Sequence, residues 1–69
     1  MTNNELKKLI KNGMIFSTCD GNYYLKVGNR CVKIDMSLKN IVTFDSIKDI
    51  NTIFKTNGEY LTSKEGIYD

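Results

Sequence analysis

Two short turns, Asp20-Gly21 and Gly28-Asn29, limit what this chain can fold into more than any other sequence feature. Both dipeptides are strong β-hairpin signals, because two-residue hairpin loops need positive φ angles that Gly, Asn and Asp tolerate best. Short stretches suited to β-strands flank both turns. The sequence therefore predicts an antiparallel meander, with strands over about residues 14–19, 22–27 and 30–35.

The turns also predict which residues face each other, since the length of a hairpin loop sets the register. With two-residue loops, Phe16 faces Leu25 and Leu25 faces Val32. The two registers agree on one inward face, made of Met14, Phe16, Tyr23, Leu25, Val27, Val32 and Ile34. The outward face then carries Ile15, Ser17, Cys19, Tyr24, Lys26, Cys31, Lys33 and Asp35. Tyr24 is expected to face Ser17 and Lys33, and Lys26 to face Ile15 and Cys31.

The first segment has the pattern of an amphipathic helix over about residues 3–12. Thr2 and Glu5 have capping-box spacing, in which each side chain accepts a hydrogen bond from the other residue's backbone. Leu6, Leu9 and Ile10 follow at helical spacing, and Gly13 suits the left-handed position just past a helix end.

The second half predicts a fourth strand over about 41–44, a second helix over 46–56 and a short strand over 59–63. Asp45 or Ser46 would cap this helix, and Ile47, Ile50, Ile53 and Phe54 form its apolar stripe. Asn57-Gly58 would end it. The expected fold is one α+β domain, in which both helices pack on the same face of the sheet.

Composition narrows the classes of function. The chain has 69 residues, a net charge of +2 and no histidine, the side chain most often used as a base or metal ligand near neutral pH. The predicted registers separate Cys19 and Cys31 by roughly 13 Å along the strands, at ~3.3 Å per residue, so both thiols are expected to be free. With no catalytic or metal-binding motif, we expect a non-enzymatic protein without a cofactor. No stretch is long and apolar enough to span a membrane or to act as a secretory signal, which favours the cytoplasm.

The outward face is less polar than alternation requires, so it is the predicted binding surface. Its candidate partner contacts are Ile15, Tyr24, Lys26, Cys31 and Lys33, with Tyr24 as the anchor. An alternative is weak binding of single-stranded DNA or RNA, with Lys7, Lys8, Lys11, Tyr24, Lys26 and Lys33 as contacts. A third possibility is a homodimer formed through the same face or through the edge at residues 59–63.

In size, in its Lys-, Asn- and Ile-rich composition and in its compact α+β pattern, the chain resembles small accessory proteins carried by phages and prophages of low-GC bacteria. The resemblance concerns the character of the whole chain and assigns no residue. It implies a stoichiometric inhibitor that binds a host enzyme or a bacterial defence complex, in the manner of anti-CRISPR proteins, inside the bacterial cytoplasm.

Overall fold

The computed structural model describes residues 1–34 and 40–65 and has an α+β fold with one α-helix and a six-stranded antiparallel sheet. The elements are α1 (Asn3–Leu9), β1 (Ile15–Thr18), β2 (Tyr23–Val27), β3 (Arg30–Lys33), β4 (Ile41–Thr43), the 3₁₀ helix η1 (Phe44–Ser46), β5 (Ile50–Phe54) and β6 (Tyr60–Ser63). The strand order is β4-β3-β2-β1-β5-β6. The first four strands form a meander, and the chain then crosses back to place β5 beside β1.

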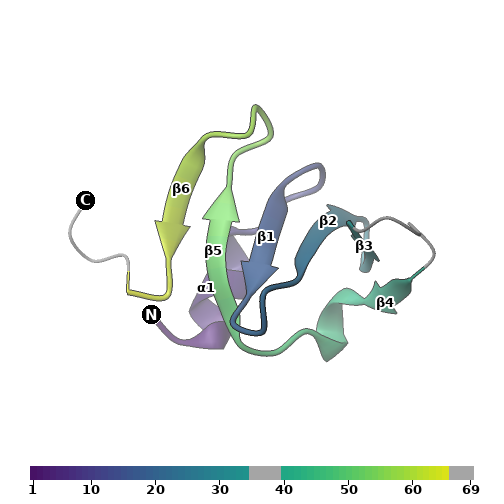
Figure 1. The fold of residues 1–69 in the computed structure, drawn as a ribbon, viewed down its shortest axis with the longest axis horizontal. Helices are drawn as coiled ribbons and strands as arrows, with labels where there is room; N and C mark the ends of the chain where they lie inside the picture. The colour runs from purple at the N-terminus through teal and green to yellow at the C-terminus, as the bar shows by residue number, and fades with distance from the viewer. Residues whose placement is uncertain (35–39, 66–69) are drawn as a thin grey trace.

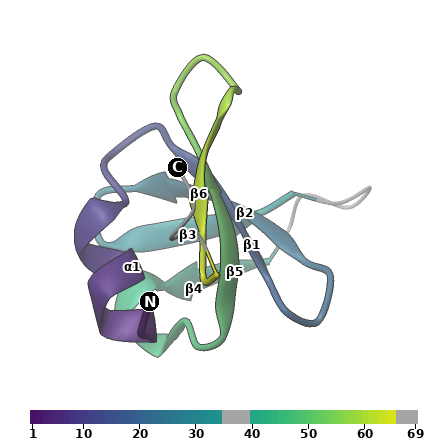
Figure 2. The same ribbon diagram turned by 90° about the vertical axis from the view of Figure 1, so that its left-hand side faces the viewer.

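The sheet is strongly twisted and α1 covers one of its faces. In Figure 1 the helix lies behind β5 and β1. In the orthogonal view of Figure 2, β3 runs across the direction of β5 and β6, and α1 lies to one side of the sheet. Among the residues that the structure describes, no helix covers the second face of the sheet.

The predicted N-terminal helix is confirmed, but it ends earlier than expected. Both hydrogen bonds of the capping box form: the Glu5 backbone N–H donates to Thr2 Oγ1, and the Thr2 N–H donates to Glu5 Oε1 at 2.7 Å. The helix ends at Leu9 because Ile10 is extended, which places its side chain in the core. Gly13 does have a positive φ of 85°, but it lies in the turn that leads to β1.

The predicted register between the first two strands is wrong by one residue. Phe16 pairs with Tyr24, and Ile15 pairs with Leu25. The Thr18 N–H donates to the Asn22 carbonyl at 2.9 Å, which leaves three residues, 19–21, in the loop. In such loops a turn is followed by a residue of positive φ, and Gly21 takes that position at 91°.

The register at Gly28-Asn29 is confirmed, with Val27 opposite Arg30 and Leu25 opposite Val32. Here the loop has two residues, and Gly28 has a φ of 63°. The predicted pairs Tyr24 with Lys33 and Lys26 with Cys31 also form. The meander is therefore correct, but β1 is shifted relative to the other two strands. The predicted end of the third strand at Asp35 lies outside the described residues.

The predicted second helix is wrong, because residues 46–56 form the end of η1, an irregular linker in which Asp49 has a φ of 59°, β5 and the start of the next loop. Ile50 and Ile53 are buried as the helical stripe predicted, but they are buried in a strand. β5 pairs with β1 with a register shift between Ser17 and Thr18, so Ile50 lies opposite Thr18 and Ile53 opposite Phe16. Ile50, Thr52 and Ile53 are β-branched and suit a pleated strand, and the bulge explains why the apolar spacing of the segment is not two.

Asn57-Gly58 forms the β5–β6 hairpin instead of ending a helix. The Lys55 N–H donates to the Glu59 carbonyl at 2.7 Å, and the Gly58 N–H donates back to the Lys55 carbonyl at 2.8 Å. The loop is thus the same three-residue kind as the one after β1, and its glycine again has positive φ, 89°. The predicted C-terminal strand is present as β6.

The core lies between α1 and the concave side of the sheet. Its buried apolar residues are Leu6, Ile10, Met14, Phe16, Cys31, Ile47, Ile50 and Ile53. Asn3 joins the helix to the returning chain, since its Nδ2 donates to the Ile47 carbonyl at 3.3 Å and its Oδ1 accepts from the Ile50 N–H at 2.9 Å. One amide side chain thereby satisfies backbone groups just before and at the start of β5.

The two matching hairpin loops give a test of the fold. Gly21→Ala and Gly58→Ala should each lower the free energy of unfolding by about 1–2 kcal/mol, because an L-residue is strained at this positive φ. Neither added Cβ would clash, since nothing lies within 4 Å of it. Urea unfolding of both variants measures the effect, with Glu59→Ala as the surface control. Unchanged midpoints for both glycine variants would contradict the three-residue loops.

Candidate functional site: the open face of the sheet

The face of the sheet opposite α1 is the main candidate site. Side chains alternate along a strand, so the register partners Ile15, Leu25 and Phe54 lie on the face opposite to buried Phe16. We call this surface the open face. Its strand residues are Ile15, Ser17, Tyr23, Leu25, Val27, Arg30, Val32, Ile41, Thr43, Thr52, Phe54, Tyr60 and Ser63.

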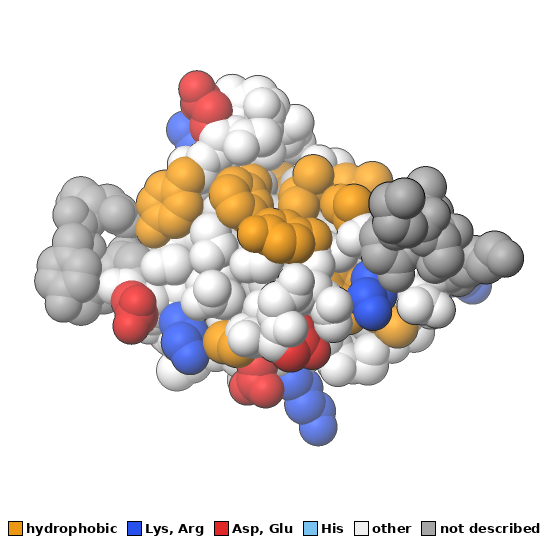
Figure 3. Space-filling model, viewed as in Figure 1, with side chains coloured by type: hydrophobic (Ala, Val, Ile, Leu, Met, Phe, Trp, Pro, Cys, Tyr) orange, Lys and Arg blue, Asp and Glu red, His pale blue; other side chains and the backbone are white. Residues whose placement is uncertain are grey.

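Exposed apolar side chains are concentrated on the open face. Among the described residues, seven large apolar side chains are exposed, and five of these belong to it or extend it: Tyr23, Val27, Ile34, Ile41 and Tyr60. Each of the five is between 42% and 57% exposed. Ile34 extends the face because its N–H donates to the Tyr23 carbonyl at 2.8 Å. Figure 3 shows the result as a band of apolar side chains across the side of the molecule that faces the viewer.

Aromatic rings form one half of this band. Tyr23 and Phe54 lie with ring centroids 6.3 Å apart and an interplanar angle of 29°. Tyr60 is the register partner of Phe54 on the neighbouring strand, which extends the aromatic row to β6. The other half is aliphatic, with Leu25, Val32 and Ile41 on adjacent strands.

The open face carries little charge. Arg30 is the only charged side chain among the strand residues of this face that the structure describes. Depletion of charge, together with tyrosine, phenylalanine and one arginine, is the composition found at the centres of protein interfaces. The arrangement can therefore bury apolar surface against another macromolecule.

Of the predicted partner contacts, only Ile15 lies on the open face. Tyr24, Lys26, Cys31 and Lys33 lie on the core side of the sheet, because the shift in the first hairpin places Tyr24 opposite Phe16. The Tyr24 ring is stacked on the Phe16 ring, with 5.5 Å between their centroids, and the Cys31 side chain is fully buried. The predicted outward and inward faces of β2 and β3 are thus exchanged.

The predicted basic contacts are divided among several places. Lys7 of α1 and Lys26 of β2 converge on Phe44, with their Nζ atoms 5.5 Å and 5.0 Å from its ring centroid. Lys26 also donates to the Gly28 carbonyl at 2.6 Å, and Lys7 to the Asp45 carbonyl at 2.9 Å. Lys8 and Lys11 are exposed on the N-terminal segment. These lysines lie apart from the aromatic row of the open face.

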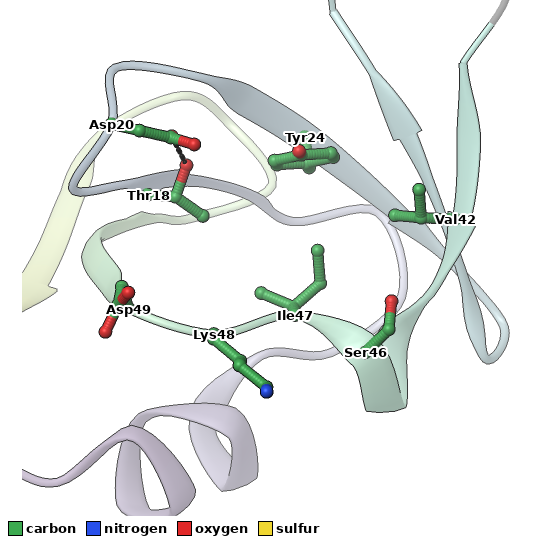
Figure 4. Close-up of a pocket in the computed structure, with 8 residues that line it drawn as sticks. All are labelled: Thr18, Asp20, Tyr24, Val42, Ser46, Ile47, Lys48 and Asp49. Carbon is green, nitrogen blue, oxygen red and sulfur yellow. Dashed lines mark hydrogen bonds between the residues drawn. The ribbon is translucent and has the colours of Figure 1, made fainter.

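A half-open cavity of about 300 Å³ lies on the core side, near the β1–β2 turn. Figure 4 shows Ile47 pointing towards Tyr24, whereas the charged ends of Lys48 and Asp49 point away from these two side chains. Asp20 at the rim accepts hydrogen bonds from Thr18 Oγ1, from the Asn22 N–H and from Asn22 Nδ2. Its carboxylate therefore stabilises the turn, and the cavity lining combines Tyr24, Val42 and Ile47 with polar and charged side chains. No cluster of three potential metal ligands occurs in the described parts of the chain.

Comparison with known proteins identifies no relative: no family profile, curated protein or solved structure matches this chain significantly. Within residues 1–34 and 40–65, no helix is long and apolar enough to cross a membrane.

The residues around the first turn indicate the observed register, although Asp20-Gly21 also fits the predicted two-residue loop. Thr18 and Asp20 flank the first turn position, and their side chains bond to each other and to Asn22 across the loop. A three-residue loop places Tyr23, Leu25 and Val27 on the face of Ile15. The same reasoning applied to Asn57-Gly58 would have revealed a second hairpin, and with it Phe54 and Tyr60.

The hydrogen bonds to Asp20 predict a pH dependence. Thr18 Oγ1 and the Asn22 N–H hold the pKa of Asp20 below its ordinary value of 3.8. A carboxylate whose pKa is lower in the folded state stabilises the fold above its unfolded pKa, and this contribution is lost as the pH falls through the folded-state pKa. Asp20→Asn should therefore make stability less dependent on pH below about 4. Urea midpoints measured across this range test the expectation, and equal slopes for variant and wild type would refute it.

The two thiols should differ in reactivity. Cys19 is exposed, whereas Cys31 is buried, and burial raises the pKa of the Cys31 thiol. Ellman's reagent should therefore label one thiol rapidly in the native protein and the second only on unfolding. Cys19→Ser should remove the rapid phase. Two rapid thiols in the wild-type protein would show that Cys31 is not buried.

Proposed function

We propose that this chain is a small non-enzymatic binding module that docks on another protein through the open face of its sheet. The observation that carries the proposal is the concentration of half-exposed Tyr23, Val27, Ile41 and Tyr60 on one weakly charged surface. Contiguous apolar patches of this kind on a folded protein usually mark an interaction site.

The resemblance to phage and prophage accessory proteins suggests which partners to test first. Inhibitors of this type act by occupying a surface of a host protein, which requires no catalytic group. A bacterial host enzyme or defence complex, as for anti-CRISPR proteins, is therefore the proposed partner, and the bacterial cytoplasm the proposed location.

Binding of single-stranded nucleic acid through Tyr24 has less support. A stacking platform needs a free aromatic face beside cations. One side of the Tyr24 ring is occupied by Phe16, and the Nζ of Lys26 is engaged with Phe44 and the Gly28 carbonyl. The open face has free aromatic surface, but it supplies only Arg30 as a cation among its described strand residues.

The proposal predicts which change to the surface weakens binding. The double variant Ile41→Lys with Tyr60→Lys adds two charges to the open face at exposed positions. It should reduce capture of the partner from a bacterial lysate about tenfold or more, since desolvating these charges would oppose docking. Quantitative mass spectrometry of material bound to the immobilised chain gives the measurement.

Leu9→Lys is the matched control, because Leu9 is an exposed apolar residue on α1, away from the open face. It should capture the same protein as the wild type. Circular dichroism should show that all three proteins are folded. Equal capture by the wild type and the double variant would overturn the proposal.

A further inference from the structure

We infer that the open face also binds a second copy of this chain, so that the protein forms a symmetric dimer with its two sheets packed face to face. This inference rests on the proposed function of the open face as a docking surface, and it names an occupant for that surface. Three features of the structure support it: the area of the face, its charge and the small size of the core.

The area of the open face suits a modest dimer interface. A fully buried aromatic side chain removes about 150–250 Å² from water, so half-exposed Tyr23 and Tyr60 each offer on the order of 100 Å². With Val27, Ile34 and Ile41, and with the half-buried Ile15, Leu25, Val32 and Phe54, the apolar area is on the order of 500 Å² per copy. Two faces together would bury about 1,000 Å², close to the lower limit for a specific interface.

The charge of the open face permits self-association. A twofold axis brings the same surface of two copies together, so any dense cluster of one charge would repel itself. The only charged strand residue of this face within the described ranges is Arg30 of β3, and it lies between Val27 of β2 and Thr43 of β4 rather than among the aromatic rings. Two sheets can therefore pack across their uncharged aromatic and aliphatic rows, in the aligned or orthogonal manner of sheet-on-sheet packing.

The size of the core explains why a second copy would be the occupant. Among the described residues the core contains eight buried apolar side chains, and the two cysteines are both free, so no bond between them cross-links the chain. The core of a chain of this length rarely makes the folded state stable by itself, and oligomerisation is one way in which small proteins gain further stability. A second copy is available whenever the chain is made, whereas a foreign partner is not.

Sedimentation velocity and light scattering over a range of protein concentrations test the inference. The wild type should approach twice its monomer mass of 7.9 kDa as concentration rises, and its melting temperature should rise with concentration. Val27→Lys, at a position more than half exposed on the open face, should remain a monomer and lose this concentration dependence. Leu9→Lys should dimerise like the wild type.

Salt separates this dimer from binding of nucleic acid. Raising the salt concentration should leave the dimer unchanged or strengthen it, because it screens the Arg30 charges, whereas a phosphate-dependent complex would weaken steeply. A monomer at every concentration, or a Val27→Lys protein that dimerises like the wild type, would overturn the inference. A monomer that shifts on a single-stranded oligonucleotide would identify nucleic acid as the occupant instead.

The same variants distinguish this inference from the proposed function. If the wild type is monomeric but Ile41→Lys with Tyr60→Lys loses a captured protein, the dimer is wrong and the docking function stands. If the wild type dimerises through the open face and every variant captures the same proteins as the wild type, the dimer stands and docking on a foreign protein is wrong.

Discussion

Burial of the Phe16 side chain in the centre of the molecule sets the orientation of the whole sheet. Phe16 lies on β1, the strand that joins the meander to β5. Its ring centroid is 5.5 Å from that of Tyr24 and 6.0 Å from that of Phe44. Its register partners are Tyr24 and Ile53. Because side chains alternate along each strand, the inward direction of this one ring directs Ile15, Leu25 and Phe54 outward.

The register that achieves this burial depends on polar contacts in a short loop. Thr18, Asp20 and Asn22 bond to one another across the β1–β2 turn, and Gly21 provides the positive φ that the third loop residue needs. A shift of one residue exchanges the faces of every residue in a strand. The small difference between a two-residue and a three-residue loop therefore decides whether Tyr24 or Tyr23 is available to a partner.

The open face follows from the size of the chain as much as from its sequence. One short helix can cover only one side of a six-stranded sheet, and η1 with its linker contributes Phe44 and Ile47 to that same side. Replacement of the expected second helix by β5 widens the sheet, and within residues 1–34 and 40–65 no helix covers its other side. The exposed apolar residues of that side, Tyr23 and Ile41 among them, lower the solubility of an isolated monomer. We therefore expect another macromolecule to cover this face.

The sequence by itself determined the local features: the Thr2–Glu5 capping box, the Gly28-Asn29 hairpin with Leu25 opposite Val32, the positions of the first four strands and the apolar character of Ile50 and Ile53. Each of these depends on neighbours close in the chain. Tertiary structure decided the rest, since Ile50 and Ile53 fit the spacing of a helix and take a strand only because β1 offers a partner edge, with a bulge that brings both side chains into the core. The identity of the exposed face also depends on tertiary structure, because Asp20-Gly21 is compatible with both a two-residue and a three-residue loop, and only the pairing that the longer loop gives places Tyr24 beside Phe16 under α1.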